Sequence, residues 1–308
     1  MGAAESRIAV WLLACPMVFA AHLSDGFNLS EPEPGIFVHR GRQLALDVPG
    51  HDDIANIGFI VGKKCVAVID TGGSASVGRE LRDAVEKHTT LPICYVINTH
   101  VHVDHVLGNT AFKNDGPSFV GSAALAAAMV RSTAFFIEQY SGDMDSPPTP
   151  EQIIGPDRLV EHELVLDLGD RQLILRAWPT AHTDCDLTVF DTATGTLWAG
   201  DLLFSERLPV LDGSIKGWLA ALDALSRMKI RLTVPGHGPI ARDPKSVIIP
   251  ERRYLQAVAD GVRGELKQGK PVEDAIEHVA AAEKSHWLLW DSVHPHNVVR
   301  AYEELEWE

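Results

Sequence analysis

The chain has 308 residues, of which 45% are hydrophobic and 22% are charged, so it can bury a large core and is neither disordered nor fibrous. Its 27 Lys and Arg residues against 42 Asp and Glu residues give a formal net charge of -15. Because that charge repels phosphate backbones and anionic lipid heads, we expect no nucleic-acid partner.

The N-terminus carries an apolar run over residues 8–20, which is too short to span a bilayer as a stable helix. The run ends in Val18-Phe19-Ala20, the small-residue pattern of a cleavage site, and predicts a signal peptide over residues 1–20. We therefore expect a periplasmic or secreted protein that begins at Ala21 and has no membrane span. A lipoprotein signal at Cys15 and an ordinary buried first helix are the alternatives.

Residues 21–35, with the run Ser30-Glu31-Pro32-Glu33-Pro34-Gly35, are expected to be a linker, and residues 36–308 one folded domain. Residues 141–148 are interpreted as a loop or insertion of the kind that borders a site. Apolar runs predict strands at 36–39, 57–61, 65–70, 93–98 and 118–120, and helical periodicity predicts helices at 76–88, 103–112 and 121–139.

The second half of the chain repeats this alternation of strands and helices. Residues 163–168 and 172–177 predict a hairpin, and residues 187–191 are expected to pair with 196–200. Further helices are predicted at 216–228, 244–268, 271–283 and 294–305. This order favours mixed sheets covered by helices, an α/β layered domain whose C-terminal helices begin at about residue 244.

Three cysteines are left after removal of the predicted signal peptide. Cys65 and Cys94 both lie in strand-like runs, and an odd number so widely spread is not a disulfide framework. We expect these two to be small buried hydrophobic residues rather than a disulfide pair. Cys185 is interpreted as a packed neighbour of His182, with a metal-ligand or redox role as the alternative.

The segment from Thr99 to His105 reads THVHVDH and lies between a predicted strand and a predicted helix. Side chains in such a loop reach past the edge of the sheet. His100 and His102, two residues apart, can face one metal, while Asp104 and His105 turn towards a second position. A solvated patch of histidines is the alternative.

Other ligand-type residues also follow predicted strands, namely His182, Asp201 and His237. Asp70 ends a further strand, and we interpret it as orienting a ligand imidazole rather than binding a metal directly. Arg207 lies just past Asp201 and is a candidate for holding a substrate carboxylate, with an exposed structural role as the alternative. The histidines and tryptophans of residues 286–296 favour core packing over a substrate lid or a docking face.

In chain order, Ile69-Asp70-Thr71-Gly72, THVHVDH, His182, Asp201 and His237 resemble the metallo-β-lactamase fold superfamily over about residues 36–240. The resemblance implies an αββα four-layer sandwich of two mixed sheets flanked by helices, with a binuclear zinc centre. One zinc would bind His100, His102 and His182, the other Asp104, His105 and His237, and Asp201 would bridge them beside a hydroxide. Asp104 and Asp201 are the carboxylates that the resemblance assigns to catalysis.

Asp201 stands where antibiotic-hydrolysing members usually carry Cys or Ser, so the chain is more similar to glyoxalase II-like hydrolases. Residues 35–41, 53–62 and 200–204 are similar to exported zinc metallohydrolases of sulfur-oxidation and quinoprotein relay systems, which implies a quinoprotein-system partner.

Two divalent ions would lower the pKa of a shared water towards about 7 and favour hydrolysis of a small-molecule thioester, ester or lactone. The alternatives are a β-lactamase-like amide hydrolase, a non-catalytic accessory protein, and a mononuclear iron persulfide dioxygenase using His100, His182 and Asp201.

Overall fold

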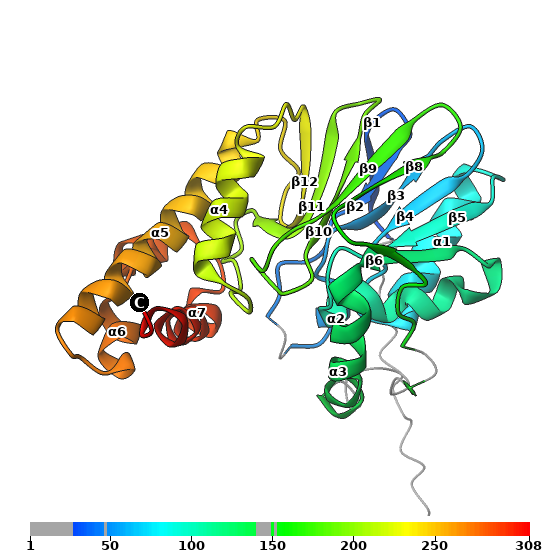
Figure 1. Ribbon diagram of the computed structural model, residues 1–308. Coiled ribbons are helices and arrows are strands. Elements are labelled where there is room, and N and C mark those ends of the chain that lie inside the picture. The colour runs from blue at the N-terminus through cyan, green and yellow to red at the C-terminus, as the bar shows by residue number, and fades with distance from the viewer. Residues whose placement is uncertain (1–26, 46–47, 140–148, 151–152) are drawn as a thin grey trace, which may run out of the picture.

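The computed structural model describes residues 27–45, 48–139, 149–150 and 153–308 (Figure 1). The predicted signal peptide and the predicted loop at 141–148 lie outside these described residues. Within them, no helix is both long and apolar enough to cross a membrane.

The first sheet has seven strands in the order β1-β2-β3-β4-β5-β6-β7. Neighbours are antiparallel from β1 to β4 and parallel from β4 to β7. The strands are β1 (Leu29–Glu33), β2 (Ile36–His39), β3 (Ile57–Val61), β4 (Val66–Ile69), β5 (Ile93–Ile97), β6 (Ser118–Ser122) and β7 (Arg158–Val160).

The second sheet has five strands in the order β12-β11-β10-β9-β8, with β11 and β12 parallel and the other neighbours antiparallel. The two hairpin-like pairs predicted from the sequence are both present in this sheet. Its strands are β8 (Glu163–Asp167), β9 (Gln172–Ala177), β10 (Leu187–Asp191), β11 (Thr196–Phe204) and β12 (Leu232–His237).

Helices cover the outer faces of both sheets, as Figure 1 shows with α1 on one side and α4 and α5 on the other. The helices are α1 (Ala75–His88), α2 (Val103–Val106), α3 (Ala123–Gln139), α4 (Ile215–Leu225), α5 (Lys245–Lys267), α6 (Val272–His278) and α7 (Trp290–Leu305). Short 3-10 segments lie at η1 (His51–Asp53), η2 (Leu107–Asp115) and η4 (Ala281–His286).

Buried side chains separate these layers into distinct cores. Val77, Leu81 and Val85 recur on one face of α1 and pack on Phe59 and Val68 of the first sheet. A second cluster joins the inner faces of the two sheets, and a third joins the second sheet to α4, α5 and α7. The result is two mixed sheets between helices, the αββα arrangement that the sequence predicts.

Two sequence predictions are wrong. Residues 29–33 of the predicted linker form β1, the edge strand of the first sheet, where a proline is tolerated because one side of the strand is unpaired. Cys65 and Cys94 form a disulfide instead of two free thiols. They lie at the starts of the adjacent parallel strands β4 and β5, with Cα atoms 5.7 Å apart, a proximity that strand pairing creates.

Element boundaries also differ from the prediction. The helix expected over 103–112 is a single α-turn followed by 3-10 structure, and α7 begins at Trp290 rather than at 294. The helix expected over 271–283 ends at His278 and continues as η4.

Candidate metal centre

The loop between β5 and α2 carries His100 and His102, and the single turn of α2 that follows carries Asp104 and His105. Buried Asn98 follows β5 and donates from Nδ2 to the carbonyl of His105 at 3.3 Å and to Asn109 Oδ1 at 3.1 Å. The backbone of Thr71 also donates to the His105 carbonyl at 2.9 Å. These contacts fold the loop back over the sheet edge, so that α2 presents Asp104 and His105 beside His100.

Asp201 reaches the same place from the middle of β11. Gly200 has a left-handed backbone with φ of +51°, and the β11–β12 register shifts between Trp198 and Gly200. The strand therefore bulges at this point, and a bulge re-aims the following side chain. A Cβ on Gly200 would lie 2.6 Å from Thr99 Cβ, so only glycine lets β11 approach the β5 loop this closely.

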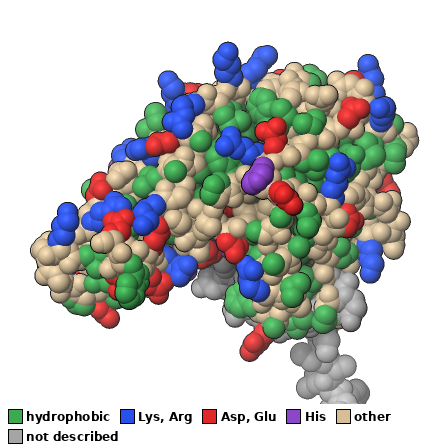
Figure 2. All heavy atoms as spheres, viewed as in Figure 1, with side chains coloured by type: hydrophobic (Ala, Val, Ile, Leu, Met, Phe, Trp, Pro, Cys, Tyr) green, Lys and Arg blue, Asp and Glu red, His purple; other side chains and the backbone are tan. Residues whose placement is uncertain are grey.

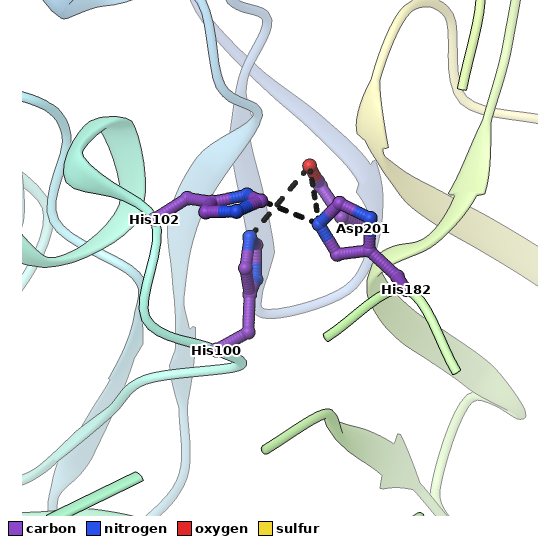
Figure 3. A group of neighbouring side chains, drawn as sticks. All are labelled: His100, His102, His182 and Asp201. Carbon is purple, nitrogen blue, oxygen red and sulfur yellow. Dashed lines mark hydrogen bonds and ion pairs between the residues drawn. The ribbon is translucent and has the colours of Figure 1, made fainter. Parts of the chain in front are cut away.

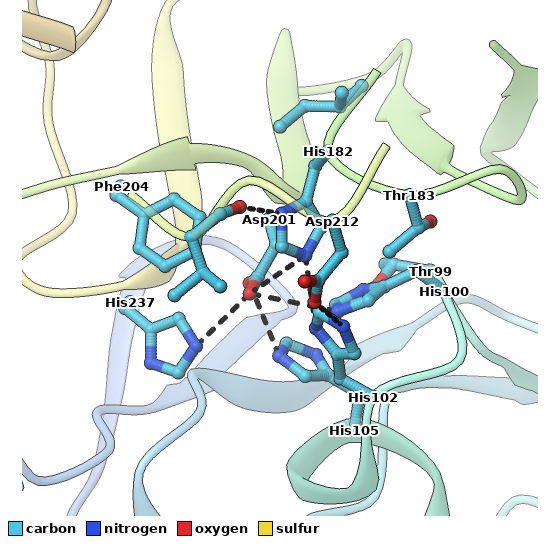
Figure 4. A network of polar contacts seen from close by, with 12 residues as sticks. Thr99, His100, His102, His105, His182, Thr183, Asp201, Phe204, Asp212 and His237 are labelled. Atoms are coloured by element: carbon cyan, nitrogen blue, oxygen red, sulfur yellow. Dashed lines mark hydrogen bonds and ion pairs between the residues drawn. The ribbon is translucent and has the colours of Figure 1, made fainter. Parts of the chain in front are cut away.

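The seven predicted ligands converge at this edge in two groups, each with its donor atoms within 4.8 Å of one another (Figures 3 and 4). The first group is His100, His102, His182 and Asp201, and the second is Asp104, His105 and His237.

Asp201 contacts members of both groups. Its Oδ2 lies 3.5 Å from His182 Nε2 and 3.3 Å from His237 Nε2, and its Oδ1 lies 3.2 Å from His105 Nε2. The second group is tied together by Asp104, whose Oδ2 lies 3.3 Å from His237 Nε2 and 3.6 Å from His105 Nε2. One carboxylate therefore lies between the two groups.

Each of the five imidazoles is held by a hydrogen bond from its outer ring nitrogen, which leaves the inner nitrogen free to bind a cation. His100 donates to Thr99 Oγ1 (3.0 Å), His102 to Asp212 Oδ2 (2.8 Å), His105 to Asp70 Oδ2 (2.8 Å), His182 to the Val210 carbonyl (2.6 Å) and His237 to the Ile54 carbonyl (2.9 Å).

Asp70 thus lies behind a ligand-type imidazole and not among the two groups. Its carboxylate also accepts from the backbone and the hydroxyl of Thr99, at 2.8 and 2.7 Å. Asp70 has φ of +52°, an uncommon value for a residue other than glycine, and such strain is typical of functional sites.

The charges of this site are strongly coupled. Burial lowers the pKa of His182 to about 4 and that of His100 well below its usual range, and neighbouring imidazoles add to both effects. Burial also lowers the pKa of His105, but Asp201, Asp104 and Asp70 outweigh it and raise that pKa well above the ordinary value. For Asp201, burial is outweighed by His237, His105 and His100, so its pKa falls well below its usual range.

The donor set fits divalent metal ions. Among the described residues, His100 Nε2, His105 Nε2 and Asp201 Oδ1 are buried without a hydrogen bond of good geometry, although the last two lie 3.2 Å apart. A bound cation would remove this cost. His102 Nδ1 and His182 Nε2 lie 3.1 Å apart, and both carry lone pairs when their outer nitrogens donate. Imidazole and carboxylate ligands of this kind suit Zn²⁺ as well as iron.

Arg207 lies beside this site but is buried, with 3% of its surface exposed, so the alternative of an exposed structural arginine is wrong. Its Nη1 donates to the Leu44 carbonyl at 2.8 Å, and its Nε has no partner among the described residues. Burial lowers the pKa of Arg207, and the charges of Asp104 and Asp201 oppose that shift.

Other predicted candidates are packed residues. Cys185 is a free, buried thiol whose pKa burial raises to about 12, and its sulfur belongs to neither ligand group. His294 is buried and stacks on Trp290 with ring centroids 3.9 Å apart, consistent with core packing.

Sequence reasoning missed Asp212, which follows β11 in a turn, and the role of His296, whose Nε2 donates to Asp212 Oδ1 at 2.7 Å. It also missed the apolar wall of the site, where Phe204 stacks on His237 with centroids 5.1 Å apart. An Asp-Gly pair in a loop is too common a turn signal to identify Asp212 beforehand. On the face of the molecule that Figure 2 shows, a histidine side chain reaches the surface near the middle, among acidic and basic side chains.

Fold and site together define a metal-binding αββα protein with a donor set compatible with two ions. A family model described as the Metallo-beta-lactamase superfamily matches residues 51–237, and the chain belongs to that superfamily.

Two curated relatives each match more than half of the chain. The chain is 27% identical over 212 residues to the Acyl-coenzyme A thioesterase MBLAC2 of Gallus gallus, a match that covers 59% of this chain and 72% of the relative. It is 24% identical over 183 residues to a Metallo-beta-lactamase type 2 of Bacillus sp. (strain 170), covering 58% of this chain and 64% of the relative.

Solved structures share the fold. The metallo-beta-lactamase from Pontibacter korlensis superposes with a TM-score of 0.60 at 19% identity, covering 74% of this chain and 98% of its own. The sec-alkylsulfatase Pisa1 from Pseudomonas sp. gives a TM-score of 0.67 at 16% identity, covering 90% of this chain and 50% of its own.

Proposed function

We propose that the protein is an exported binuclear zinc hydrolase that cleaves a small-molecule thioester, with an ester or lactone as the next candidate. The observation that carries this proposal is the placement of the Asp201 carboxylate between the two ligand groups. Its oxygens lie 3.5 Å from His182 Nε2 in the first group, and 3.3 Å from His237 Nε2 and 3.2 Å from His105 Nε2 in the second. Two bound divalent ions would supply a hydroxide at neutral pH and polarise the scissile carbonyl.

The residues of the site prepare this chemistry. Asp201 would offset the repulsion between two cations and hold them close to each other. The hydrogen bonds that the imidazoles donate to Asp70, Thr99 and the two backbone carbonyls keep these rings in one tautomer and one orientation, which limits reorganisation during the reaction. Phe204 and Trp218 pack around the ring of His182 and exclude water from one side of the site.

Thioesters are the substrates that demand least of such a site. A thiolate leaves without a proton, whereas the nitrogen of an amide must be protonated on departure. The relative named as an acyl-coenzyme A thioesterase supports this preference, and the relative named as a metallo-beta-lactamase defines the competing amide substrate.

We also propose that the protein is exported and has a partner in a quinoprotein system. The Cys65–Cys94 disulfide supports export, because such bonds persist in oxidising compartments. N-terminal sequencing of the exported protein should give Ala21, and an intact Met1 on protein retained in the cytoplasm would contradict export.

Substrate preference is tested by comparing catalytic efficiencies on a small thioester, an aryl ester or lactone, and a cephalosporin with the same zinc-loaded protein. We expect the thioester to be cleaved fastest. A preference for the cephalosporin would overturn the thioesterase proposal and leave an amide hydrolase.

Metal stoichiometry is tested on protein purified without added metal. We expect two zinc ions per chain, about one in His105→Ala, and a folded but nearly inactive Asp201→Ala that has lost metal. His105→Ala should retain the first metal because His100, His102 and His182 are intact. A single iron that His105→Ala leaves unchanged would overturn the binuclear scheme and favour the persulfide dioxygenase.

A further inference from the structure

One loop supplies the outer hydrogen-bond partners of two imidazoles in the first ligand group. This loop, residues 209–214, is the second part of the connection between β11 and α4. Its Val210 carbonyl accepts from His182 Nδ1 at 2.6 Å, and its Asp212 carboxylate accepts from His102 Nε2 at 2.8 Å. The orientation of both rings therefore depends on where loop 209–214 lies.

The C-terminal helix α7 holds this loop at its centre. Asn297 Oδ1 accepts from the backbone of Leu211 at 2.8 Å, and Asn297 Nδ2 donates to the Pro209 carbonyl at 2.6 Å. Asn297 is fully buried, and its Nδ2 also donates to the hydroxyl of Tyr254 at 2.9 Å. A buried amide with all its partners in place fixes one position of the loop, because any shift leaves a polar group unpaired.

Further contacts from the same helix hold the acidic end of the loop. His296 Nε2 donates to Asp212 Oδ1 at 2.7 Å, and Arg300 Nη2 donates to the Asp212 carbonyl at 3.0 Å. Glu304 accepts from Ser214 Oγ and from the backbone of Ile215, both at 2.7 Å. His296, Arg300 and Glu304 are spaced four residues apart, so they lie on one face of α7.

We propose that α7 is a positioning element of the metal centre. His296 and Asn297 act through loop 209–214: they place Asp212 and the Val210 carbonyl so that His102 and His182 present the correct ring nitrogen to the first metal. This inference rests on the proposed metal binding, and it adds to the site a helix that lies beyond the residues matched by the family model. Partners that orient ligand imidazoles are worth about 10- to 100-fold in metal affinity.

The test compares zinc affinity, measured by chelator competition, in His296→Ala and Asn297→Ala with that of the wild type. The absorption spectrum of the cobalt-substituted protein reports the ligand geometry independently of activity. We expect both variants to bind the first metal about 10- to 100-fold more weakly and to change the cobalt spectrum. His296→Gln, which keeps an N–H donor for Asp212, should restore much of the affinity.

Two control variants separate positioning from folding. Tyr302→Phe removes the hydrogen bond from α7 to the Lys270 carbonyl, 2.8 Å long, and Val298→Ala removes buried packing of α7. Neither side chain has a hydrogen bond to the described residues of loop 209–214. Both should lower the free energy of unfolding in urea and leave zinc affinity within about twofold of wild type. Wild-type affinity in His296→Ala and Asn297→Ala, or an equal loss in Val298→Ala, would overturn the inference.

The outcomes also separate this inference from the proposed function. If the wild type binds metal but cleaves none of the three test substrates, the proposed reaction is overturned. The zinc affinities of the variants relative to wild type then still test the role of α7. A wild type that binds no metal overturns both.

Discussion

Gly236 in β12 is the position where the smallest substitution should do most damage to the metal centre. A Cβ built on Gly236 would coincide with Asp201 Oδ1 and lie 2.8 Å from the backbone carbon of Gly200. Since backbone blocks one side, Gly236→Ala must displace the Asp201 carboxylate or separate β11 from β12. Inserting a methyl group into such a packed site costs about 1–3 kcal/mol of stability. A displacement of Asp201 by about 1 Å should reduce activity by about 100-fold.

Gly264→Ala is the matched control. Gly264 lies in α5, and a Cβ at this position would have nothing within 4 Å. This change should raise the free energy of unfolding by about 0.5–1 kcal/mol, because alanine favours helix and has fewer unfolded conformations to lose. It should leave metal content and activity unchanged.

Both variants are compared with wild type by urea unfolding, elemental analysis and thioester hydrolysis in one buffer. We expect Gly236→Ala to lose metal as well as activity, which distinguishes damage to the site from a general loss of fold. Two metals and wild-type activity in Gly236→Ala would show that the metal centre does not depend on the position of the Asp201 carboxylate between the two ligand groups.

Three further predictions concern a buried acid, the disulfide and the buried arginine. Burial raises the pKa of Glu251 well above its ordinary 4.5. The folded state therefore keeps a proton that the unfolded chain releases above pH 4.5. As a result, the contribution of Glu251 to the free energy of unfolding falls as pH rises above 4.5. In urea unfolding at pH 5 and pH 9, Glu251→Gln should therefore lose less stability than wild type over that interval, and equal losses would contradict a buried neutral acid. Replacing Cys65 and Cys94 by serine removes a cross-link between residues 29 apart and should cost about 3 kcal/mol. Reductant should destabilise the wild type similarly and leave the double variant unchanged, whereas an unaltered unfolding midpoint would refute a structural disulfide. Arg207→Met should raise KM about tenfold for a thioester that carries a carboxylate, since a charge-assisted hydrogen bond is worth about 1.5–3 kcal/mol. A neutral thioester should be unaffected, and equal effects on both substrates would exclude a role in anion binding.

Local sequence is sufficient for the features that depend on neighbouring residues. The periodicity of α1 and the alternating runs of β8 and β9 follow from side-chain spacing along the chain, and the structure has these elements almost as predicted. The THVHVDH segment is equally local, because four ligand-type residues within six positions directly after β5 necessarily lie at the same sheet edge. His182 and His237 could be added because each follows or ends a strand of the neighbouring sheet. Asp201 could be added because the sequence predicts a strand that ends just before it, although β11 continues to Phe204.

Contacts between residues that are far apart in the chain could be found only from the tertiary structure. Cys65 and Cys94 meet only because β4 and β5 are neighbours, and residues 29–33 become a strand only because β2 offers them a free edge. Arg207 is buried because the loop that contains Leu44 accepts its hydrogen bond. Asp212 and His296 are 84 residues apart and carry no common pattern, so their contact arises only when α7 packs beside the loop between β11 and α4. Hydrogen-bond partners behind a ligand need only a donor or an acceptor at the right point in space, and that requirement leaves no periodicity in the sequence.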